Sequence, residues 1–387
     1  MALTPLYADG SQTYIAYAEE ATFGTMPADL TLLRTTGNTL DLAKNTFLSD
    51  ELKSGRELME LRHGNLAPAG DISCELIHGE WDTLLQGAMG SAWSAAVTTG
   101  AVDTIAFVDS NPDTITDTDN GFVDAGFKAG MKITVAVDGG HANDGNYTIA
   151  TVAAGTLTLV ATDSVTALAA GTDTTISASI LQQGTSFYSY AFEKGFVDIA
   201  EYFQYTGLVV NSFTLNLNPE SMITYSFGFL GKGATLAQAP KDAGLSAANT
   251  TSPYDTYSAN FEEAGTAITH LSSLTLNINN GITPNYALGD DEVIEMSFGR
   301  SNVSGTFTAF FKDDTLWDKF NAETESTLQI NLLGPDSGDE YAFTIHRVKY
   351  TAASEPVSDD GAIIQTFDFQ SLYKTDNSSN ITISRIA

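Results

Sequence analysis

Hydrophobic and polar residues alternate in several short stretches of this chain, and the stretches occur twice in the same order. Those of the first half are residues 40–42, 57–61, 70–76 and a final pair, 208–217 with 223–230. Those of the second half are residues 274–278, 293–298, 305–311 and a final pair, 341–350 with 363–372. In each half a short helix pattern follows the third stretch, around Trp81 and Trp317, and both tryptophans are expected in the core. Such a repeat predicts two related β modules in one chain.

The expected strands have one apolar face and one face of short polar side chains. Leu274, Leu276 and Ile278, for example, alternate with Thr275 and Asn277. A period of two places one face against a core and the other in water. Lys and Arg are rare on the polar face, which we expect to carry Asp71, Glu75, Thr275 and Glu295. Such a face suits the wall of a channel that a polyanion passes without sticking, although an ordinary solvated sheet face has the same pattern.

A change in composition marks an inserted segment at residues 101–180. From residue 101 to 179 there are ten Asp, no Glu and only two basic residues, Lys128 and Lys132. Alternating stretches separated by turn residues predict strands at 104–108, 131–137, 147–152 and 156–160. The segment is therefore expected to be a small all-β domain.

The whole chain is thus predicted to be all-β with one short helix per module. It consists of two tandem duplicated β-sandwich or barrel modules plus a small inserted β domain. Residues 1–100 and 181–235 form the first module, 101–180 the insert, and 255–387 the second module. Residues 236–254, rich in Ala, Gly, Ser and Thr, connect the modules.

Composition and motifs argue against catalysis. The net charge of -31, from 48 acidic and 17 basic residues, disfavours a surface that binds nucleic acid. The five histidines are scattered, and residues 117–121 fail as a calcium loop because Lys128 stands where a Glu is required. The single cysteine, Cys74, is expected to be a small core residue. We predict no catalytic, cofactor-binding or metal-binding residues; a chance pair of glycosidase-like carboxylates is the weakest alternative.

The first residues, Met1 to Pro5, lack the basic and apolar regions of a signal peptide. No apolar run in the chain is long enough to span a bilayer. We therefore expect synthesis in the cytosol and no insertion of this chain into a membrane.

The chain resembles a known family at residues 14–27, YIAYAEEATFGTMP. This stretch is similar to the N-terminal signature of the tail tube proteins (major tail proteins) of long-tailed bacteriophages. Residues 33–34, 49–52, 70–72 and 300–307 also fit that family's pattern. The resemblance covers residues 14–80 and 185–372, and the insert looks like the optional decoration domains of phage tail proteins. It implies a structural virion protein, made in the bacterial host cytoplasm without a cofactor, whose rings stack into a tube for DNA ejection. The implied partners are other copies of the chain, DNA in transit, and the tape measure, tail terminator and distal tail proteins.

By this resemblance, the sheets of neighbouring chains join in one inner barrel. A barrel of about 24 strands spaced about 4.8 Å apart has a circumference of about 115 Å and a diameter of about 37 Å, wider than a DNA duplex. If each module supplies four strands, three chains close a ring with pseudo-sixfold symmetry, which we favour over a ring of six chains. The alternative function is a non-tubular β-rich virion or cell-surface binding protein whose insert binds a receptor or a glycan.

Both modules have a long loop between their first two strand patterns, at residues 43–56 and 279–292. Loops of this length in a compact β module are usually functional or disordered, and the apolar content of these two argues against disorder. We expect both to dock on the neighbouring ring; a loop folded over its own module is the alternative. The candidate contact residues are Phe47, Leu48, Leu52, Ile282, Tyr286 and Leu288.

Overall fold

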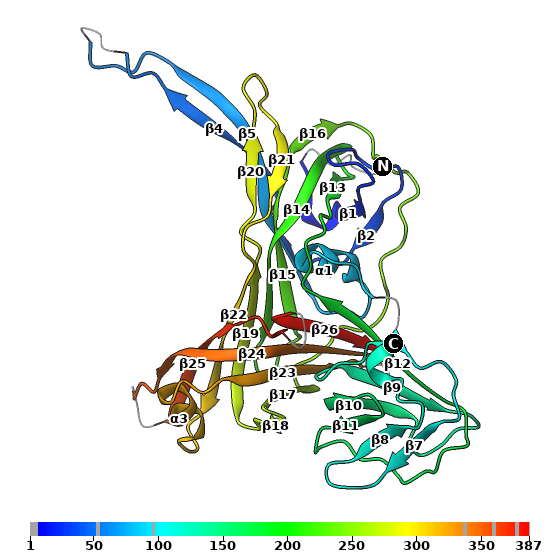
Figure 1. Ribbon diagram of the computed structural model, residues 1–387. Coiled ribbons are helices and arrows are strands. Elements are labelled where there is room, and N and C mark those ends of the chain that lie inside the picture. The colour runs from blue at the N-terminus through cyan, green and yellow to red at the C-terminus, as the bar shows by residue number, and fades with distance from the viewer. Residues whose placement is uncertain are drawn as a thin grey trace.

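The computed structural model describes residues 7–51, 55–94, 97–335, 339–357, 361–375 and 379–386. β-Strands make up most of it: 24 strands are connected in one hydrogen-bonded network, and two more form a separate hairpin. The helical elements of this part are short: η1 (Gly10–Gln12), α1 (Asp82–Met89), α2 (Phe122–Ala125) and α3 (Thr315–Asn321). The all-β class predicted from the alternation is confirmed (Figure 1).

One antiparallel sheet, called the central sheet below, runs through both modules. Its strands follow one another in the order β3 (Gly37–Asn38) with β4 (Asp41–Leu48), β5 (Leu61–Glu75), β15 (Thr224–Leu230), β14 (Glu201–Leu217), β19 (Leu271–Asn279), β22 (Asn302–Phe310), β25 (Ile364–Ser371) and β24 (Glu340–Ser354). Leu274, Leu276 and Ile278 of β19 are buried, as their spacing predicts. Pairing of β14 with β19 joins the modules into one sheet.

The two halves of the central sheet have the same strand order. If the strands of each half are numbered 1 to 4 along the chain, their order in the sheet is 1, 2, 4, 3. This order is β3–β4, β5, β15, β14 in the first half and β19, β22, β25, β24 in the second. Gly70 and Gly305 occupy corresponding places, each opposite a Phe of the fourth strand. The third strands share a bulge, after Val210 in β14 and after Tyr350 in β24. The predicted duplication is therefore confirmed.

A second layer of strands and a helix covers the apolar face of each half of the central sheet. In the first module this layer contains β1 (Thr13–Glu19), β2 (Thr31–Leu33), β13 (Tyr190–Phe196), β16 (Gly233–Ala237) and α1. In the second module it contains β17 (Ala259–Glu263), β18 (Thr266–Ala267), β23 (Ser326–Leu333), β26 (Ile381–Ile386) and α3. Strands β14 and β24 are long enough, at 17 and 15 residues, to belong to both layers.

A single hydrophobic core extends through both modules. The rings of Phe213 and Phe343, one from each module, stack with centroids 6.3 Å apart. Trp81 is 2% exposed and Cys74 is fully buried, as predicted. Trp317, in contrast, is 40% exposed, because α3 turns Leu316 rather than Trp317 toward the core. The prediction of Trp317 as a core residue is wrong.

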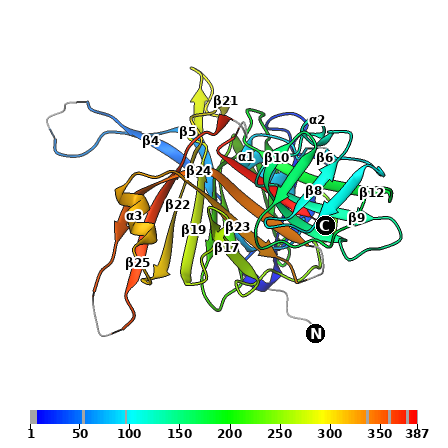
Figure 2. The ribbon, with the colours of Figure 1, turned by 60° about the horizontal axis from the view of Figure 1, so that its bottom comes forward.

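The inserted segment has its own hydrophobic core, which includes Phe107, Ile133 and Leu157. Its strands are β6 (Val97–Thr98), β7 (Ile105–Val108), β8 (Thr114–Asp117), β9 (Lys132–Val137), β10 (Gly145–Ala153), β11 (Thr156–Leu159) and β12 (Thr174–Gln182). The end of β12 pairs with β26, so that Leu181 lies opposite Ile383. The insert is thus attached to the last strand of the second module, beside which it lies in both ribbon views (Figures 1 and 2).

The two predicted loops are hairpins. β4 pairs with the first part of β5 over residues 41–69, and this hairpin, called the arm below, projects away from the rest of the molecule (Figure 1). The prediction of a loop at 43–56 and a strand at 57–61 is wrong, because residues 43–48 belong to β4 and the loop follows them. In the second module, β20 (Thr283–Tyr286) pairs with β21 (Val293–Ser297). We call residues 283–297 the second hairpin.

Candidate functional site: a polar wall and two open strand edges

The polar face of the central sheet is built from rows of short side chains that cross the strands. One row consists of Glu75, Thr224, Asn216, Thr275, Thr306 and Asp368. Thr275 Oγ1 donates to Asn216 Oδ1 at 3.1 Å, and Thr306 Oγ1 donates to Asp368 Oδ1 at 2.6 Å. In the neighbouring row, Thr214 Oγ1 donates to Asn277 Oδ1 at 2.9 Å. These bonds hold the side chains down on the sheet and make the face smooth and hydrophilic.

The residues predicted for this face are divided between the central sheet and the second hairpin. Asp71, Glu75 and Thr275 lie on it, and Glu75 and Thr275 share a row. Glu295 lies instead on β21 of the second hairpin, outside the central sheet. Its placement on the same face is therefore wrong; the pattern of residues 293–298 imitates that of a wall strand. Sequence reasoning missed Asp368, although Phe367 and Phe369 alternate with it.

The polar face has a negative electrostatic character. From residues 70–75 of β5 to β25 its rows contain three acids, Asp71, Glu75 and Asp368, and no Lys or Arg. Beyond β25 the next strand brings a cation, Lys349 of β24, whose Nζ lies 3.7 Å from an oxygen of Glu323. A surface with this distribution repels phosphate and offers it no strong hydrogen-bond donor with positive charge.

The two ends of the central sheet have open edges. On β14, the edge of residues 212–217 is occupied by β19, the first strand of the next module. The corresponding edge of β24, at residues 349–354, pairs with no strand in the part of the chain that the structure describes. At the opposite end, β3 and β4 pair on one side only, with β5, within the same described ranges. The β24 end of the sheet therefore has a free edge where β14 binds the first strand of a module. The opposite end consists of such a first strand, β3–β4, with its outer edge free.

The signature at residues 14–27 has a structural role at the top of the first module. Glu20 is buried, and its carboxylate accepts hydrogen bonds of 2.8 Å from Gly24 N, Gly207 N and Ser189 Oγ. Burial raises the pKa of Glu20, and the three donors act against this rise. The loop held in this way places Phe23 beneath the ammonium of Lys232, 5.8 Å from its ring centre.

The second hairpin rests on this surface. Val209 of β14 is buried against Ile282, Val293 and Met296, and Phe23 packs beside them. Ile282 N donates to Asn211 Oδ1 at 2.9 Å. Ile282 is thus part of an interface within the chain, as is Tyr286, whose pKa burial raises. Leu288, between the two strands, is fully exposed.

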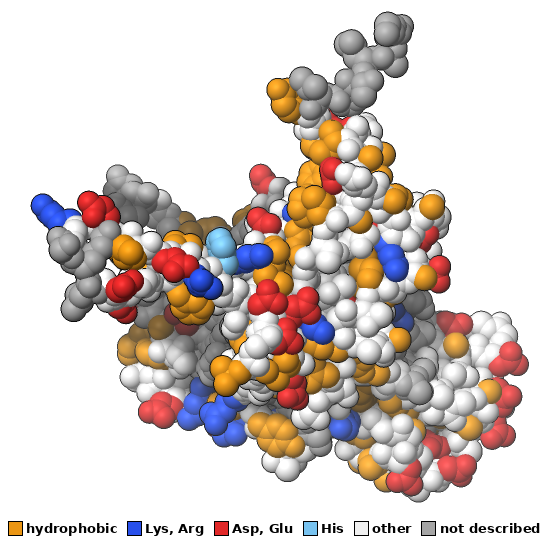
Figure 3. Space-filling model, turned by 90° about the horizontal axis from the view of Figure 1, so that it is seen from above, with side chains coloured by type: hydrophobic (Ala, Val, Ile, Leu, Met, Phe, Trp, Pro, Cys, Tyr) orange, Lys and Arg blue, Asp and Glu red, His pale blue; other side chains and the backbone are white. Residues whose placement is uncertain are grey.

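The outer part of the arm, beyond Leu66, has no comparable support from the residues that the structure describes. Phe47 and Leu48 are 61% and 53% exposed, and Leu58, Met59 and Leu61 are also exposed. Leu52 lies outside the described residues. Hydrophobic side chains and charges of both signs lie along the arm, at the left of Figure 3, whereas acidic side chains gather on the insert at the right. An apolar strip of this kind on a projecting hairpin indicates a contact with another molecule. Docking of these residues on a neighbouring ring stays a prediction.

No residues in the described part of the chain form a group of three or more His, Cys, Asp or Glu side chains placed to hold a metal ion. Within the same part, none of the helices has the length and apolarity needed to cross a membrane.

Comparisons with known proteins agree with this geometry. A family model described as "Phage tail tube protein" matches residues 10–371. The match covers the insert and both modules as far as residue 371. No curated protein matches the chain.

Proposed function

Because the chain belongs to the phage tail tube protein family, we propose that it polymerises into rings whose central sheets form one closed barrel. The observation that carries the proposal is the pair of open edges. β24 offers the edge that β14 uses to bind β19, and β3–β4 is the counterpart of β19. Pairing of the two edges in neighbouring copies would repeat the junction between the modules and leave no edge unpaired.

The duplication predicts the register of this contact. Phe213 and Ala353 correspond, since they lie opposite Phe227 and Phe367 at the same distance from the shared bulge. Ile278 and Leu42 also correspond. Ile278 lies opposite Val303, two residues before Gly305, and Leu42 lies opposite Pro68, two residues before Gly70. Since Phe213 lies opposite Ile278, Ala353 of one copy should lie opposite Leu42 of the next.

Three copies give the barrel its size. Each chain contributes eight strand positions to the central sheet, so three chains reach the roughly 24 strands that enclose a bore wider than a DNA duplex. The polar face would line that bore, because the opposite face is the hydrophobic core. Its acids and hydroxyls would let DNA pass during ejection without binding.

The remaining elements would act outside the barrel wall. We propose that the exposed tips, with Phe47 and Leu48 on the arm and Leu288 on the second hairpin, contact the neighbouring ring when rings stack. Residues 101–180 would form an outward decoration domain on modules formed by 1–100 with 181–235 and by 255–387, joined through 236–254. Tape measure, tail terminator and distal tail proteins are the partners proposed at the tube's interior and ends.

Electron microscopy of the assembled protein tests this function directly. We expect hollow rings or tubes with three chains per ring, and six full chains per ring or discrete monomers would contradict the proposal. Cysteines at Leu42 and Ala353 should form disulfides between copies only in the assembled state, since opposed residues of an antiparallel pair bring their Cβ atoms to about 5 Å. Cysteines at Asn38 and Ala353, four positions out of register, are the control and should not react.

A further inference from the structure

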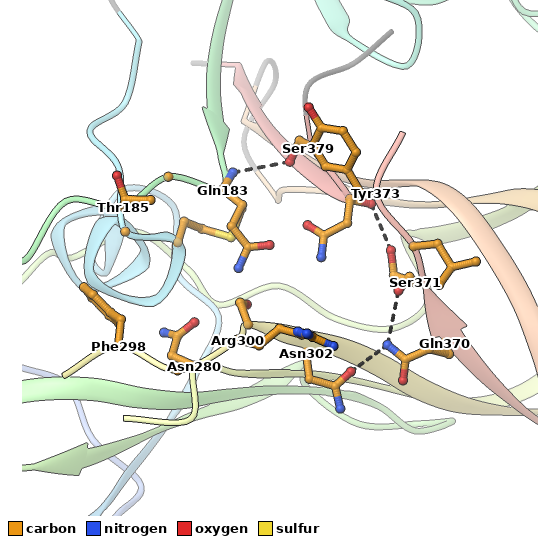
Figure 4. A pocket seen from close by; sticks show the side chains of 17 residues that line it. Gln183, Thr185, Asn280, Phe298, Arg300, Asn302, Gln370, Ser371, Tyr373 and Ser379 are labelled. Carbon is orange, nitrogen blue, oxygen red and sulfur yellow. Dashed lines mark hydrogen bonds between the residues drawn. The ribbon is translucent and has the colours of Figure 1, made fainter. Parts of the chain in front are cut away.

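A cavity of about 840 Å³ opens where the end of α1 faces the upper ends of β22 and β25 (Figure 4). Its lining is rich in amides and hydroxyls, with Phe298, Leu372 and Tyr373 as apolar surfaces. Among the described residues that line it, Arg300 is the one with a charged side chain. The elements that line the cavity, the end of α1, the start of β22 and the end of β25, lie on the side of the second module from which the arm and the second hairpin project (Figure 1).

Several polar groups of this cavity lack a partner within the described chain. Ser301 Oγ and Asn380 Oδ1 are buried and accept or donate no hydrogen bond there. The Arg300 guanidinium forms no ion pair with any described residue, in a chain whose net charge is -31. Buried polar atoms are nearly always paired in a complete structure. The cavity is therefore chemically suited to a polar occupant that carries a carboxylate.

The duplication identifies which element fills the corresponding place in the first module. Counting from the paired glycines, Leu66 corresponds to Ser301 and Leu230 to Gln370. Leu66 N donates to Asp291 O at 2.8 Å, and its carbonyl accepts from Tyr286. Leu230 packs beside the second hairpin. The rim positions that hold this hairpin in the first module thus line the cavity in the second.

The arm is the counterpart of the second hairpin, since each connects the first strand of its module to the second. We propose that this cavity receives the Leu58–Met59 side of the arm of another copy, the one whose β3–β4 edge continues the sheet at β24, while Phe47 and Leu48 stay available to the neighbouring ring. This proposal rests on the proposed ring. The arm carries both apolar and acidic side chains, because exposed Leu58 and Met59 lie between Glu57 and Glu60. Glu60 Oε1 accepts a hydrogen bond of 2.9 Å from Arg62 Nε within the arm, which leaves its second oxygen for another donor. These acids would face Arg300, and the apolar side chains would face Phe298 and Tyr373.

Disulfide trapping tests this contact. Cysteines replace Met59 on the arm and Tyr373 at the cavity; native Cys74 is fully buried and remains unreactive. Tubes carrying M59C and Y373C should give covalently linked dimers and trimers on non-reducing gels after mild oxidation. The control pair is M59C with Y257C, because Tyr257 is 97% exposed at the opposite end of the central sheet. That pair should stay monomeric on the gel.

The outcomes separate this proposal from the proposed function. Tubes that link through Y257C and not through Y373C would overturn the cavity assignment while leaving the tube intact. Failure of the unmodified chain to form any ring would overturn the proposed function first. In tubes, Arg300→Glu should slow linkage through Y373C about tenfold by reversing the charge that faces the acids of the arm. An unchanged rate, with Arg300→Lys as the matched control, would contradict the role of Arg300.

Discussion

The hydroxyl of Tyr286 donates a hydrogen bond of 2.9 Å to the carbonyl of Leu66, two residues that are 220 positions apart in the chain. The bond ties the second hairpin, which belongs to the second module by sequence, to a strand of the first. Together with Val209 and Ile282 it makes the junction between modules more than a pairing of sheet edges. A ring built by repeating this junction would gain the same support between chains.

Tyr286→Phe is expected to loosen the second hairpin without unfolding the module. The variant leaves the Leu66 carbonyl without its side-chain donor, and the free energy of unfolding should fall by about 1 kcal/mol. Hydrogen exchange of the amides in β20 and β21 should become faster. Tyr257→Phe, at a side chain that is 97% exposed, is the control and should change neither quantity. Equal exchange in both variants would show that the bond does not hold the hairpin.

Replacement of Phe47 and Leu48 by Ser is expected to block assembly and leave the subunit folded. Both side chains are exposed, so their loss removes no core contact and the melting temperature should change little. Light scattering should show no growth of tubes at concentrations where the parent assembles. Val123→Ser, at an exposed apolar residue of the insert, is the matched control and should assemble normally. Normal tube growth by the arm variant would contradict a contact role for the arm.

Removal of the insert is expected to succeed only if the end of β12 is kept. Ser179–Gln182 pair with β26, and Ser94 N donates to Ile180 O at 2.8 Å, so the flanking segments already lie side by side. A variant that lacks residues 97–178 and joins its ends through two glycines should therefore fold and assemble. Glu340 then loses its ion pair with Lys132, but its carboxylate becomes hydrated. The loss in the free energy of unfolding should therefore be small.

A second deletion, of residues 97–182, provides the comparison. It removes the strand that covers one edge of β26 and exposes Ile381 and Ile383, both buried in the intact chain. We expect aggregation or a clearly lower melting temperature for this variant alone. Loss of assembly in the shorter deletion, with a folded subunit, would contradict a purely peripheral insert.

Much of the central sheet could be predicted from the sequence because each of its strands buries one face. That packing requires the alternation at Leu274, Leu276 and Ile278. It also requires small residues opposite a Phe of the next strand, at Gly70 and Gly305. The arm could not be predicted, because residues 41–48 of β4 and 61–67 of β5 include no buried residue, and residues 61–63 are exposed. Where a strand buries neither of its faces, nothing requires apolar and polar residues to alternate along it. Apolar Leu58 and Met59 consequently imitate a buried strand.

The contacts that join distant segments also escaped prediction. Residues 293–298 alternate as a wall strand does, yet they pack their apolar side on Val209 of the other module. The pairing of β12 with β26 depends on the C-terminal strand reaching the insert, which no local pattern records. The bulges of β14 and β24 decide where each strand leaves the central sheet, and their residues, Val210 and Tyr350, have no common sequence signal.

The stability of the protein is expected to fall in mild acid because of His346. Burial lowers the pKa of His346 to about 4, against an ordinary value of 6.5, and Nε2 lies 2.7 Å from Thr382 Oγ1. Between these values the unfolded chain takes up a proton that the folded chain does not. Stability is therefore complete above about pH 6.5 and is lost as the pH falls toward 4, by roughly 3 kcal/mol in total.

His346→Gln should flatten this dependence in urea unfolding measured at several pH values from 7 to 4. Glutamine keeps a donor for Thr382 and does not titrate, so only the pH-dependent part of the stability should change. His63→Gln, at an exposed position on the arm, is the control and should retain the slope of the parent. The same slope in all three proteins would show that other groups cause the acid sensitivity.

The last prediction concerns the charge of the polar face. Lys at Asp71, Glu75 and Thr275 would place three cations in rows that have none between β5 and β25. All three side chains point away from the core, so rings should still form. DNA ejection should become slow at low salt, because phosphates would exchange counterions for fixed lysines, and it should recover steeply as salt rises. The control places Lys at Asp119, Asp124 and Asp138 of the insert, which makes a similar change in net charge far from the bore. Equal slowing by both variants would mean that net charge, and not the wall, controls the rate; slowing by the wall variant alone would assign this face to the channel.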